Sequence, residues 1–182
     1  NEAPAITSNG GGSTTSISFA ENNTSSVTTI TSSDQDAGDT ATYSISGTDV
    51  DDFSINAGSG VLTFASTPDF EIPTDSDANN TYIVIVTVTD GGSLTGTQTI
   101  TITVTAVNET PWITSNSAGN TASISFDENN TSAVTTLTST DLDAGDTATY
   151  SISGEDASNF EINASTGVLT FVNTPNFEIP TD

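Results

Sequence analysis

The sequence predicts an all-β protein made of tandem Greek-key β-sandwiches with seven strands per repeat. Short runs in which apolar residues alternate with Thr or Ser are separated by Gly, Asn and Asp turn signals. No window combines helical spacing with helix caps. Residues 1–75 also recur as residues 108–182, with 54 of the 75 aligned positions identical. An offset of 107 residues suits a whole sandwich domain, so we expect one repeat at 1–107 and a second, truncated repeat at 108–182.

Seven strands are expected in the first repeat. The first begins at Ile6, is interrupted by Gly10–Gly12 and continues at 16–19. The other six are expected at 27–31, 42–46, 53–56, 61–64, 82–89 and 99–107. In the sixth strand the apolar side chains fall on alternate positions and therefore on one face. The second repeat stops before its last two strands.

The charge is one-sided and excludes several classes of partner. There are 24 Asp and Glu, no Lys, Arg, His or Cys, and the net charge is -24. Without cationic side chains we expect no nucleic-acid partner and no attraction to anionic membranes. No apolar run is long enough for direct membrane insertion, and the lack of Cys excludes a disulfide scaffold. Such a chain repels itself when compact, and divalent cations would relieve that repulsion.

Catalysis is not expected from this composition. A chain without His, Lys, Cys or Arg lacks the usual bases, nucleophiles and oxyanion partners. A carboxylate pair for glycoside hydrolysis is the formal alternative, but the acids fall at predicted repeat ends and not in a cleft. We therefore expect that the protein is not an enzyme.

The most chemically suggestive motif is DQDAGD, which begins at Asp34 and returns as DLDAGD from Asp141. An Asp-x-Asp spacing on a loop lets both carboxylates converge on one ion. Calcium takes six to eight oxygen ligands, whereas the absence of thiols and imidazoles excludes sites for soft metals. Other loop acids are expected to be solvated turn residues: Asp49, Asp51, Asp52, Asp75 and Asp77.

Six motifs in order along the first repeat carry a family resemblance. They are FAEN from Phe19, DQDAGDTATYSISG from Asp34, FSINAGSGVLTF from Phe53, DFE from Asp69, the strand that ends in Asp90-Gly91, and AVNETP from Ala106. Together they resemble an extracellular cadherin repeat, in the bacterial cadherin-like form found in giant surface adhesins. The linker departs from the family pattern, since VNET stands where two aspartates are expected.

This resemblance implies Ca²⁺ sites at the junctions between repeats. For the junction inside this chain it implies ligands from both repeats and the linker: Glu21, Asp69, Glu71, Asn108, Glu109, Asp141, Asp143 and Asp146. Two further sets would face junctions with other repeats, before Asn1 and after the second repeat: Asp34, Asp36 and Asp90, and then Glu128 and Glu178. Asn176 replaces Asp69 in the second repeat, which should weaken the later junction.

The expected function is that of a calcium-stiffened spacer repeat in a cell-surface or secreted adhesin, located outside the cell. Its partners would be calcium and neighbouring repeats of the same or an identical chain. One alternative is a subunit of a self-assembling extracellular filament, and a weaker one is a module that binds a cell-surface polysaccharide. The sequence has neither an initiating Met nor a signal peptide, which predicts an excerpt from a longer precursor.

Overall fold

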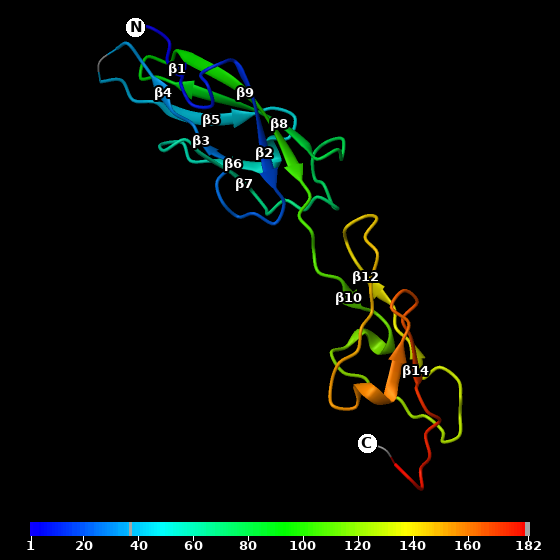
Figure 1. Cartoon of the computed structure of the whole chain (residues 1–182). Coiled ribbons are helices and arrows are strands. Elements are labelled where there is room, and N and C mark those ends of the chain that lie inside the picture. The colour runs from blue at the N-terminus through cyan, green and yellow to red at the C-terminus, as the bar shows by residue number, and fades with distance from the viewer. Residues whose placement is uncertain (37, 181–182) are drawn as a thin grey trace. The chain divides into compact units, whose positions relative to one another are not determined.

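The computed structural model describes residues 1–36 and 38–180, and the chain forms two compact units. They are Asn1–Val107 and Asn108–Asp182, which we describe separately (Figure 1). Asp182, the expected last residue of the second repeat, lies outside the described residues. Throughout the described ranges, regular structure consists of β-strands and short 3₁₀ turns, without an α-helix. The prediction of an all-β fold is confirmed.

The first unit is a sandwich of two main sheets. Its elements are β1 (Ala5–Ile6), β2 (Thr14–Ala20), β3 (Thr28–Thr29), β4 (Ser32–Ser33), β5 (Thr42–Ser46), η1 (Val50–Asp52), β6 (Phe53–Ile55), β7 (Val61–Phe64), β8 (Thr81–Thr89) and β9 (Thr95–Thr105). One sheet has the order β2-β9-β8-β5, and the other has the order β3-β7-β6. A small ribbon pairs β1 with β4. β2 runs parallel to β9, and all other pairs are antiparallel.

The core follows from the alternation that the sequence displays. In β8 the residues from Tyr82 to Val88 at every second position are 0 % exposed, and Ile100 and Ile102 of β9 are equally buried. The residues between them, which are Ile83, Ile85, Thr87 and Thr101, point to the opposite face of the sheet, because successive strand residues alternate in direction. From the other sheet Leu62 and Phe53 close the same core cluster. The buried alternation therefore fixes which face of each sheet is inside.

The expected strand 27–31 is shortened to β3 (Thr28–Thr29), and the unexpected β4 (Ser32–Ser33) follows it and pairs with β1 instead. The strand boundaries also differ from expectation in two further places. β1 and β2 belong to different sheets, because Gly10 and Gly11 adopt positive φ (82° and 68°) and turn the chain between them. β9 begins at Thr95, four residues earlier than expected, since it pairs with β8 along its whole length from Thr89↔Thr95 onward. In both places long-range pairing decides the boundary.

The second unit repeats only part of this plan. Its elements are β10 (Trp112–Ile113), η2 (Asn116–Ala118), β11 (Thr135–Thr136), β12 (Ser139–Thr140), η3 (Ala157–Asn159), β13 (Phe160–Ile162) and β14 (Val168–Phe171). They form the ribbon β10-β12 and the sheet β11-β14-β13. Segments 121–126 and 149–153, which match β2 and β5 in sequence, form no regular strand. In the first unit those strands pair with β9 and β8, and residues 108–182 include no counterpart of either.

Candidate metal centres

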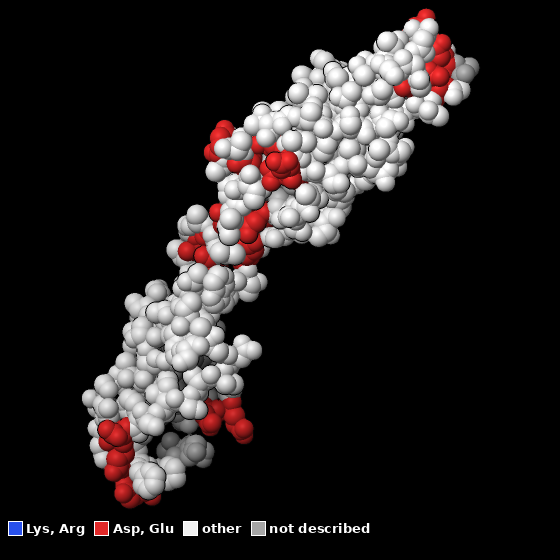
Figure 2. Space-filling view, turned by 180° about the vertical axis from the view of Figure 1, so that it is seen from behind, with Lys and Arg blue, Asp and Glu red and all other residues white. Residues whose placement is uncertain are grey.

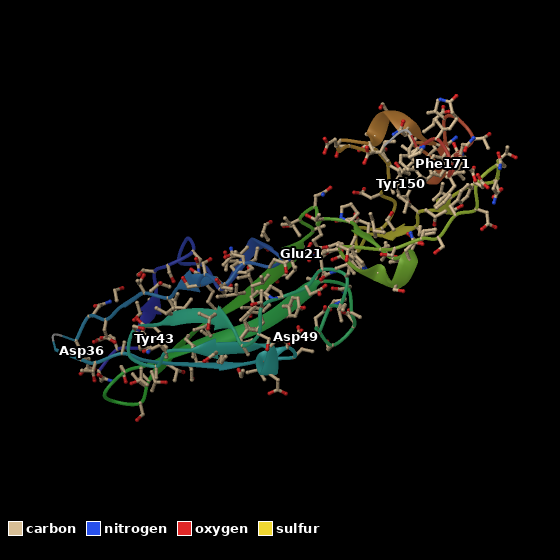
Figure 3. All side chains as sticks on the ribbon, turned by 90° about the horizontal axis from the view of Figure 1, so that it is seen from below. Glu21, Asp36, Tyr43, Asp49, Tyr150 and Phe171 are labelled. Atoms are coloured by element: carbon tan, nitrogen blue, oxygen red, sulfur yellow. The ribbon has the colours of Figure 1, made fainter. Side chains whose placement is uncertain are left out.

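At one end of the first unit an acidic loop gathers Asp34, Asp36 and Asp39, which we call the first DxD group. Each offers a carboxylate oxygen within 4.8 Å of the others. Asp34 Oδ1 accepts the N–H of Asp36 at 2.8 Å, which folds the loop back on itself. Asp36 Oδ2 accepts the N–H of Glu2 at 2.7 Å, so the N-terminal segment is tied to the loop. Figure 3 shows Asp36 at this end and Glu21 toward the opposite end of the unit.

The electrostatics of the first DxD group are those of crowded like charges. Desolvation raises the pKa of Asp39, and the negative charges of Asp90, Asp34 and Asp36 raise it further. Asp90 is buried and accepts the N–H of Leu94 at 2.8 Å and the side-chain amide of Asn1 at 2.9 Å. Asp34 Oδ2 is buried without a hydrogen-bond partner. A cation at this loop would satisfy that oxygen and offset the repulsion.

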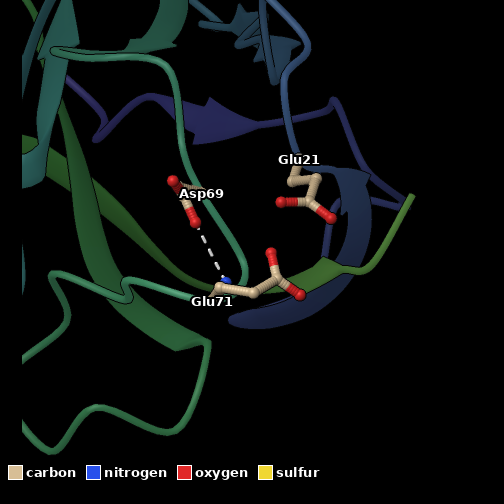
Figure 4. A group of neighbouring side chains, drawn as sticks. All are labelled: Glu21, Asp69 and Glu71. Carbon is tan, nitrogen blue, oxygen red and sulfur yellow. Dashed lines mark hydrogen bonds between the residues drawn. The ribbon is translucent and has the colours of Figure 1, made fainter. Parts of the chain in front are cut away.

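A second cluster, the Glu21 group, joins Glu21 with Asp69 and Glu71 (Figure 4). Glu21 is only 2 % exposed, and its two oxygens accept the N–H groups of Phe70 at 2.8 Å and Val107 at 2.7 Å. Asp69 Oδ1 accepts the N–H of Glu71 at 3.0 Å. The three carboxylates face one another and again offer oxygens within 4.8 Å. The segments around residues 21, 69–71 and 107, which are far apart in the sequence, thus meet at Glu21.

In the second unit Asp141, Asp143 and Asp146 form a second DxD group with the same local geometry. Their carboxylate oxygens lie within 4.8 Å of one another. Asp141 Oδ1 accepts the N–H of Asp143 at 3.0 Å, and Asp143 Oδ2 accepts the N–H of Glu109 at 2.7 Å. The side-chain amide of Asn108 donates to the carbonyl of Glu109 at 3.0 Å. Asn108 and Glu109 of the linker are the counterparts of Asn1 and Glu2 in the first unit. The N–H of Glu109 donates to Asp143 as the N–H of Glu2 donates to Asp36.

Glu128 and Glu178 are placed less favourably. Glu128 is exposed and accepts one N–H, that of Phe177, at 3.1 Å. Asn176 stands where the first unit has Asp69, and its Oδ1 accepts the N–H of Glu178 at 2.9 Å. No cluster of three acids includes this pair among the described residues. The substitution of Asn for Asp removes one anionic ligand and leaves the backbone turn intact.

Acidic residues outside these groups correct part of the sequence interpretation. Asp49 and Asp75 were expected to be solvated, but they are 4 % and 5 % exposed. Asp49 accepts the N–H groups of Ser76 at 2.9 Å and Ile83 at 2.7 Å, and Asp75 accepts those of Asn79 and Asn80. Buried carboxylates that accept backbone N–H groups replace missing ladder bonds. In the view of Figure 2 acidic side chains gather in separate patches over the surface.

Sequence reasoning did not assign Asp39 as a ligand, although its counterpart Asp146 was assigned. Both residues are the last Asp of the DxDAGD motif, so comparison of the two repeats could have identified Asp39 as a candidate ligand. The other members of the three groups were all predicted ligands, and the structure brings them close together within their own units. Their joint coordination of an ion stays a prediction.

The donor set fits calcium. Every candidate ligand is a carboxylate, amide or carbonyl oxygen, which hard divalent cations prefer. The buried Asp34 Oδ2 without a partner and the raised pKa of Asp39 both indicate a place where positive charge is missing. Each DxD group offers three carboxylate oxygens within 4.8 Å of one another, which is up to half of the six to eight oxygen ligands that calcium takes.

A sequence model of the cadherin domain matches residues 15–105, which is half of the chain. The chain belongs to the cadherin domain family. Members of this family are extracellular adhesion domains without enzymatic activity, and cadherin domains generally bind calcium. No curated protein sequence gives a significant match.

Solved cadherin structures share the fold at low sequence identity. Human protocadherin-24 EC1-2 aligns with a TM-score of 0.63 and 23 % identity, over 96 % of this cadherin and 81 % of that chain. Mouse cadherin-23 EC22-24 gives 0.61 and 17 %, over 98 % and 56 %, and Drosophila N-cadherin EC1-4 gives 0.56 and 22 %, over 95 % and 41 %. The cadherin part of the sequence-based resemblance is therefore confirmed. Among the described residues of this cadherin, no helix has the length and apolar character that a membrane span requires.

Proposed function

We propose that this chain is a pair of calcium-stiffened extracellular spacer repeats, at 1–107 and 108–182, from a bacterial cell-surface or secreted adhesin. The observation that carries the proposal is the state of the three acidic groups. Each gathers three carboxylates within 4.8 Å, with no cationic side chain anywhere in the sequence to balance them. A bound cation would offset this repulsion and hold the carboxylates together.

Calcium at the junction would be held by the Glu21 group, by Asn108 and Glu109 of the linker, and by the second DxD group. Glu21 already uses one lone pair on each oxygen for a backbone N–H, which orients its carboxylate and leaves further lone pairs for a metal. Asp143 likewise holds the linker through Glu109 while keeping acceptor capacity. Ligands fixed by backbone hydrogen bonds lose little entropy when an ion binds.

Bound calcium would supply the positive charge that neutralises these carboxylates and would cross-link the segments that carry them. The chain's own contribution is to preset the carboxylates on turns that backbone N–H groups define. Stiffening then follows because the linker between repeats loses its freedom when its oxygens share ions with both repeats. Removal of calcium would restore that freedom and the like-charge repulsion.

A self-assembling extracellular filament is the second candidate function. It is favoured by apolar residues that the first unit exposes, since Ile72 is 66 % and Ile83 is 41 % exposed. Exposed apolar patches of this kind often mark contacts with other proteins. Electron micrographs of the purified chain separate the candidates, because ordered fibres favour the filament and dispersed rods favour the spacer. Binding of a surface polysaccharide stays a prediction.

Calcium should raise the melting temperature reversibly. At a free calcium concentration 100 times the Kd, binding stabilises the folded state by about 2.7 kcal/mol. For a domain of this size that corresponds to a shift of roughly 10–20 °C. Scanning calorimetry with calcium, then with excess chelator, measures the shift. If both traces have the same midpoint, the calcium-stiffened repeat is wrong.

The junction itself is tested by Asp141→Ala combined with Asp143→Ala. Isothermal titration calorimetry should show fewer bound calcium ions and a smaller calcium-induced shift in melting temperature. The matched control is Glu155→Ala with Asp156→Ala, which removes two exposed acids outside the acidic groups. Equal losses in both double variants would indicate a general charge effect and would contradict a defined site.

A further inference from the structure

The strand β2 lies at a free edge of the four-stranded sheet in the first unit, since β9 covers only one of its two edges. The carbonyl of Ser13 accepts the N–H of Thr99 at 2.9 Å, and the N–H of Glu21 donates to the carbonyl of Thr105 at 3.0 Å. Odd-numbered residues therefore face β9. Because backbone groups alternate in direction along a strand, those of the even-numbered residues in Thr14–Ala20 point away from β9. No backbone hydrogen bond among the described residues reaches this outer edge.

This edge lacks the features that usually protect an exposed strand. Such edges are commonly short, charged, bulged or interrupted by Pro. β2 has seven residues without Pro or charge, and its pairing with β9 is regular from Thr14↔Thr99 to Ala20↔Thr105. The edge strands β3, β6 and β5 have only two, three and five residues. β2 is therefore the longest edge strand in the described part of the two main sheets.

The sequence around β2 is also free of charge. Residues 3–20 include none of the 24 acids of the chain, and the nearest acids in the sequence are Glu2 and Glu21. A second acidic molecule can therefore approach the edge without setting carboxylates directly against one another. A cationic partner would instead be attracted to the acidic groups described above. The charge distribution thus favours another copy of this chain at the edge of β2.

β2 is complementary to itself in the antiparallel direction. With a two-fold axis at Ile17, Ser16 lies opposite the partner's Ser18, and Thr14 lies opposite the partner's Ala20. These are the residues whose backbone groups point outward, so each free N–H meets a free carbonyl of the other strand. Ile17, which is only partly buried, then lies opposite the partner's Ile17 in a non-hydrogen-bonded pair, where side chains approach closely.

We propose that two copies of this chain associate edge to edge through antiparallel β2 strands, so that their four-stranded sheets form one continuous sheet. The two-fold axis closes the pair, which needs no further copy. In this register Glu21 lies opposite the partner's Ser13. The two glutamates are then separated by about 8 residues of strand, or roughly 27 Å. The remaining repulsion between two chains of charge -24 makes the association salt-dependent.

Sedimentation equilibrium of the whole chain in chelator tests this association independently of calcium and of the proposed spacer function. The range of charge repulsion is about 3 Å at about 1 M sodium chloride and about 30 Å at about 0.01 M. We expect a reversible dimer at high salt, with at least ten-fold weaker association at low salt. Amide exchange at Ser16 and Ser18 should slow as the protein concentration rises, because their N–H groups become hydrogen-bonded. A chain that stays monomeric at high salt overturns the proposal.

Paired charge substitutions at exposed positions test the register without removing a buried contact. Ser16→Asp with Ser18→Asp sets like charges opposite each other across the two strands and should weaken the dimer at least ten-fold. Ser16→Lys with Ser18→Asp should restore it, because each introduced Lys then faces an introduced Asp of the partner. The matched control is Ser44→Asp with Ser46→Asp, which adds the same charge at exposed positions of β5 and should weaken the dimer less than two-fold. Equal weakening by both Asp pairs, or no recovery with the Lys and Asp pair, overturns the proposal.

Discussion

Glu21 is the only residue of its acidic group that is almost completely buried, and its two oxygens serve two backbone donors. In Glu21→Gln an amide NH₂ replaces one oxygen and faces a backbone N–H, which then lacks an acceptor. A buried donor without a partner costs about 1–3 kcal/mol. We therefore expect the free energy of unfolding to fall by about 2 kcal/mol, measured by urea denaturation in chelator.

Glu128→Gln is the matched control for this prediction. Glu128 is exposed and accepts a single N–H at 3.1 Å, so water can replace the lost acceptor. Its substitution should change the free energy of unfolding by less than about 0.5 kcal/mol. Equal effects of the two changes would show that burial of Glu21 does not matter to stability.

Asp77 contributes to the pH dependence of stability in the first unit, and the sign of its contribution follows from the direction of its pKa shift. Its hydrogen bond to the Asp75 carboxylate, then desolvation, raises the pKa of Asp77 above the ordinary 3.8. Burial alone would raise the pKa of Asp75, but N–H donors from Asn79 and Asn80 and the hydrogen bond from Asp77 bring it below 3.8. For Asp77 the folded state holds the proton more tightly, so its stabilising contribution is present below pH 3.8 and is lost as pH rises through the raised pKa.

Asp77→Asn should therefore stabilise the chain at neutral pH, because an amide donates to Asp75 at every pH and carries no repelling charge. The gain should shrink toward zero at about pH 3, where Asp77 itself is protonated. Urea denaturation at about pH 3 and about pH 7 in chelator measures it, with Asp51→Asn, an exposed acid, as control. A gain that is the same at both pH values would contradict the shared proton.

At the residue scale the Asp-x-Asp spacing predicted that Asp34 lies near Asp36 and Asp141 near Asp143, and the cadherin resemblance implied that Glu21 lies near Asp69 and Glu71. The sequence could not predict that Asp49 and Asp75 are buried, since an acid in a Gly- and Ser-rich loop has the same local pattern whether it faces water or a backbone N–H. Only the folded path of η1 and the loop before β8 brings those donors to the carboxylates. Burial of polar residues depends on long-range packing that local spacing does not encode.

Among the elements, the turn between β6 and β7 depends on Gly60. Its φ is +70°, and a Cβ there would collide with the carbonyl oxygen of Ile30, which lies next to β3. The N–H of Ile30 also donates to the carbonyl of Gly60 at 2.8 Å, so the two backbones cannot separate without loss of that bond. This close approach holds β3 against β7.

Gly60→Ala should therefore lower the free energy of unfolding by more than the roughly 1–3 kcal/mol expected from φ strain alone. Gly38→Ala separates the two causes, because Gly38 has φ +96° and an added Cβ would meet no atom within 4 Å. Thermal or urea denaturation of both variants gives the comparison. If Gly38→Ala costs as much as Gly60→Ala, the collision with Ile30 contributes nothing.

Strand positions were predictable where apolar and polar residues alternate strongly. They were less predictable where pairing with a neighbouring strand determines whether a strand forms. Thr42–Ser46 and Val61–Phe64 lie as predicted, because each carries a clear period of two. The same Tyr-containing sequence at 149–153 forms no strand among the described residues, since its ladder partner is missing from the second unit. Strand formation in this fold therefore requires a neighbour as well as a suitable sequence.

For the whole molecule the decisive quantity is a net charge of -24 without one Lys, Arg or His. In the absence of calcium this charge opposes the compact state through self-repulsion. The range of that repulsion falls from about 30 Å at 0.01 M salt to about 3 Å at 1 M. Sodium chloride in chelator should therefore raise the melting temperature progressively over this range.

Calcium at millimolar concentration should do more than the same ionic strength of sodium chloride, because site-bound ions act at the carboxylates and not through the diffuse ion atmosphere. Once the sites are filled, the salt dependence of the melting temperature should become markedly smaller, since the closest repulsive pairs are already neutralised. Calorimetric scans across a sodium chloride series, with calcium and with chelator, measure both slopes. Parallel slopes would mean that calcium acts only as a screening ion, and the acidic groups would then be solvated surface clusters.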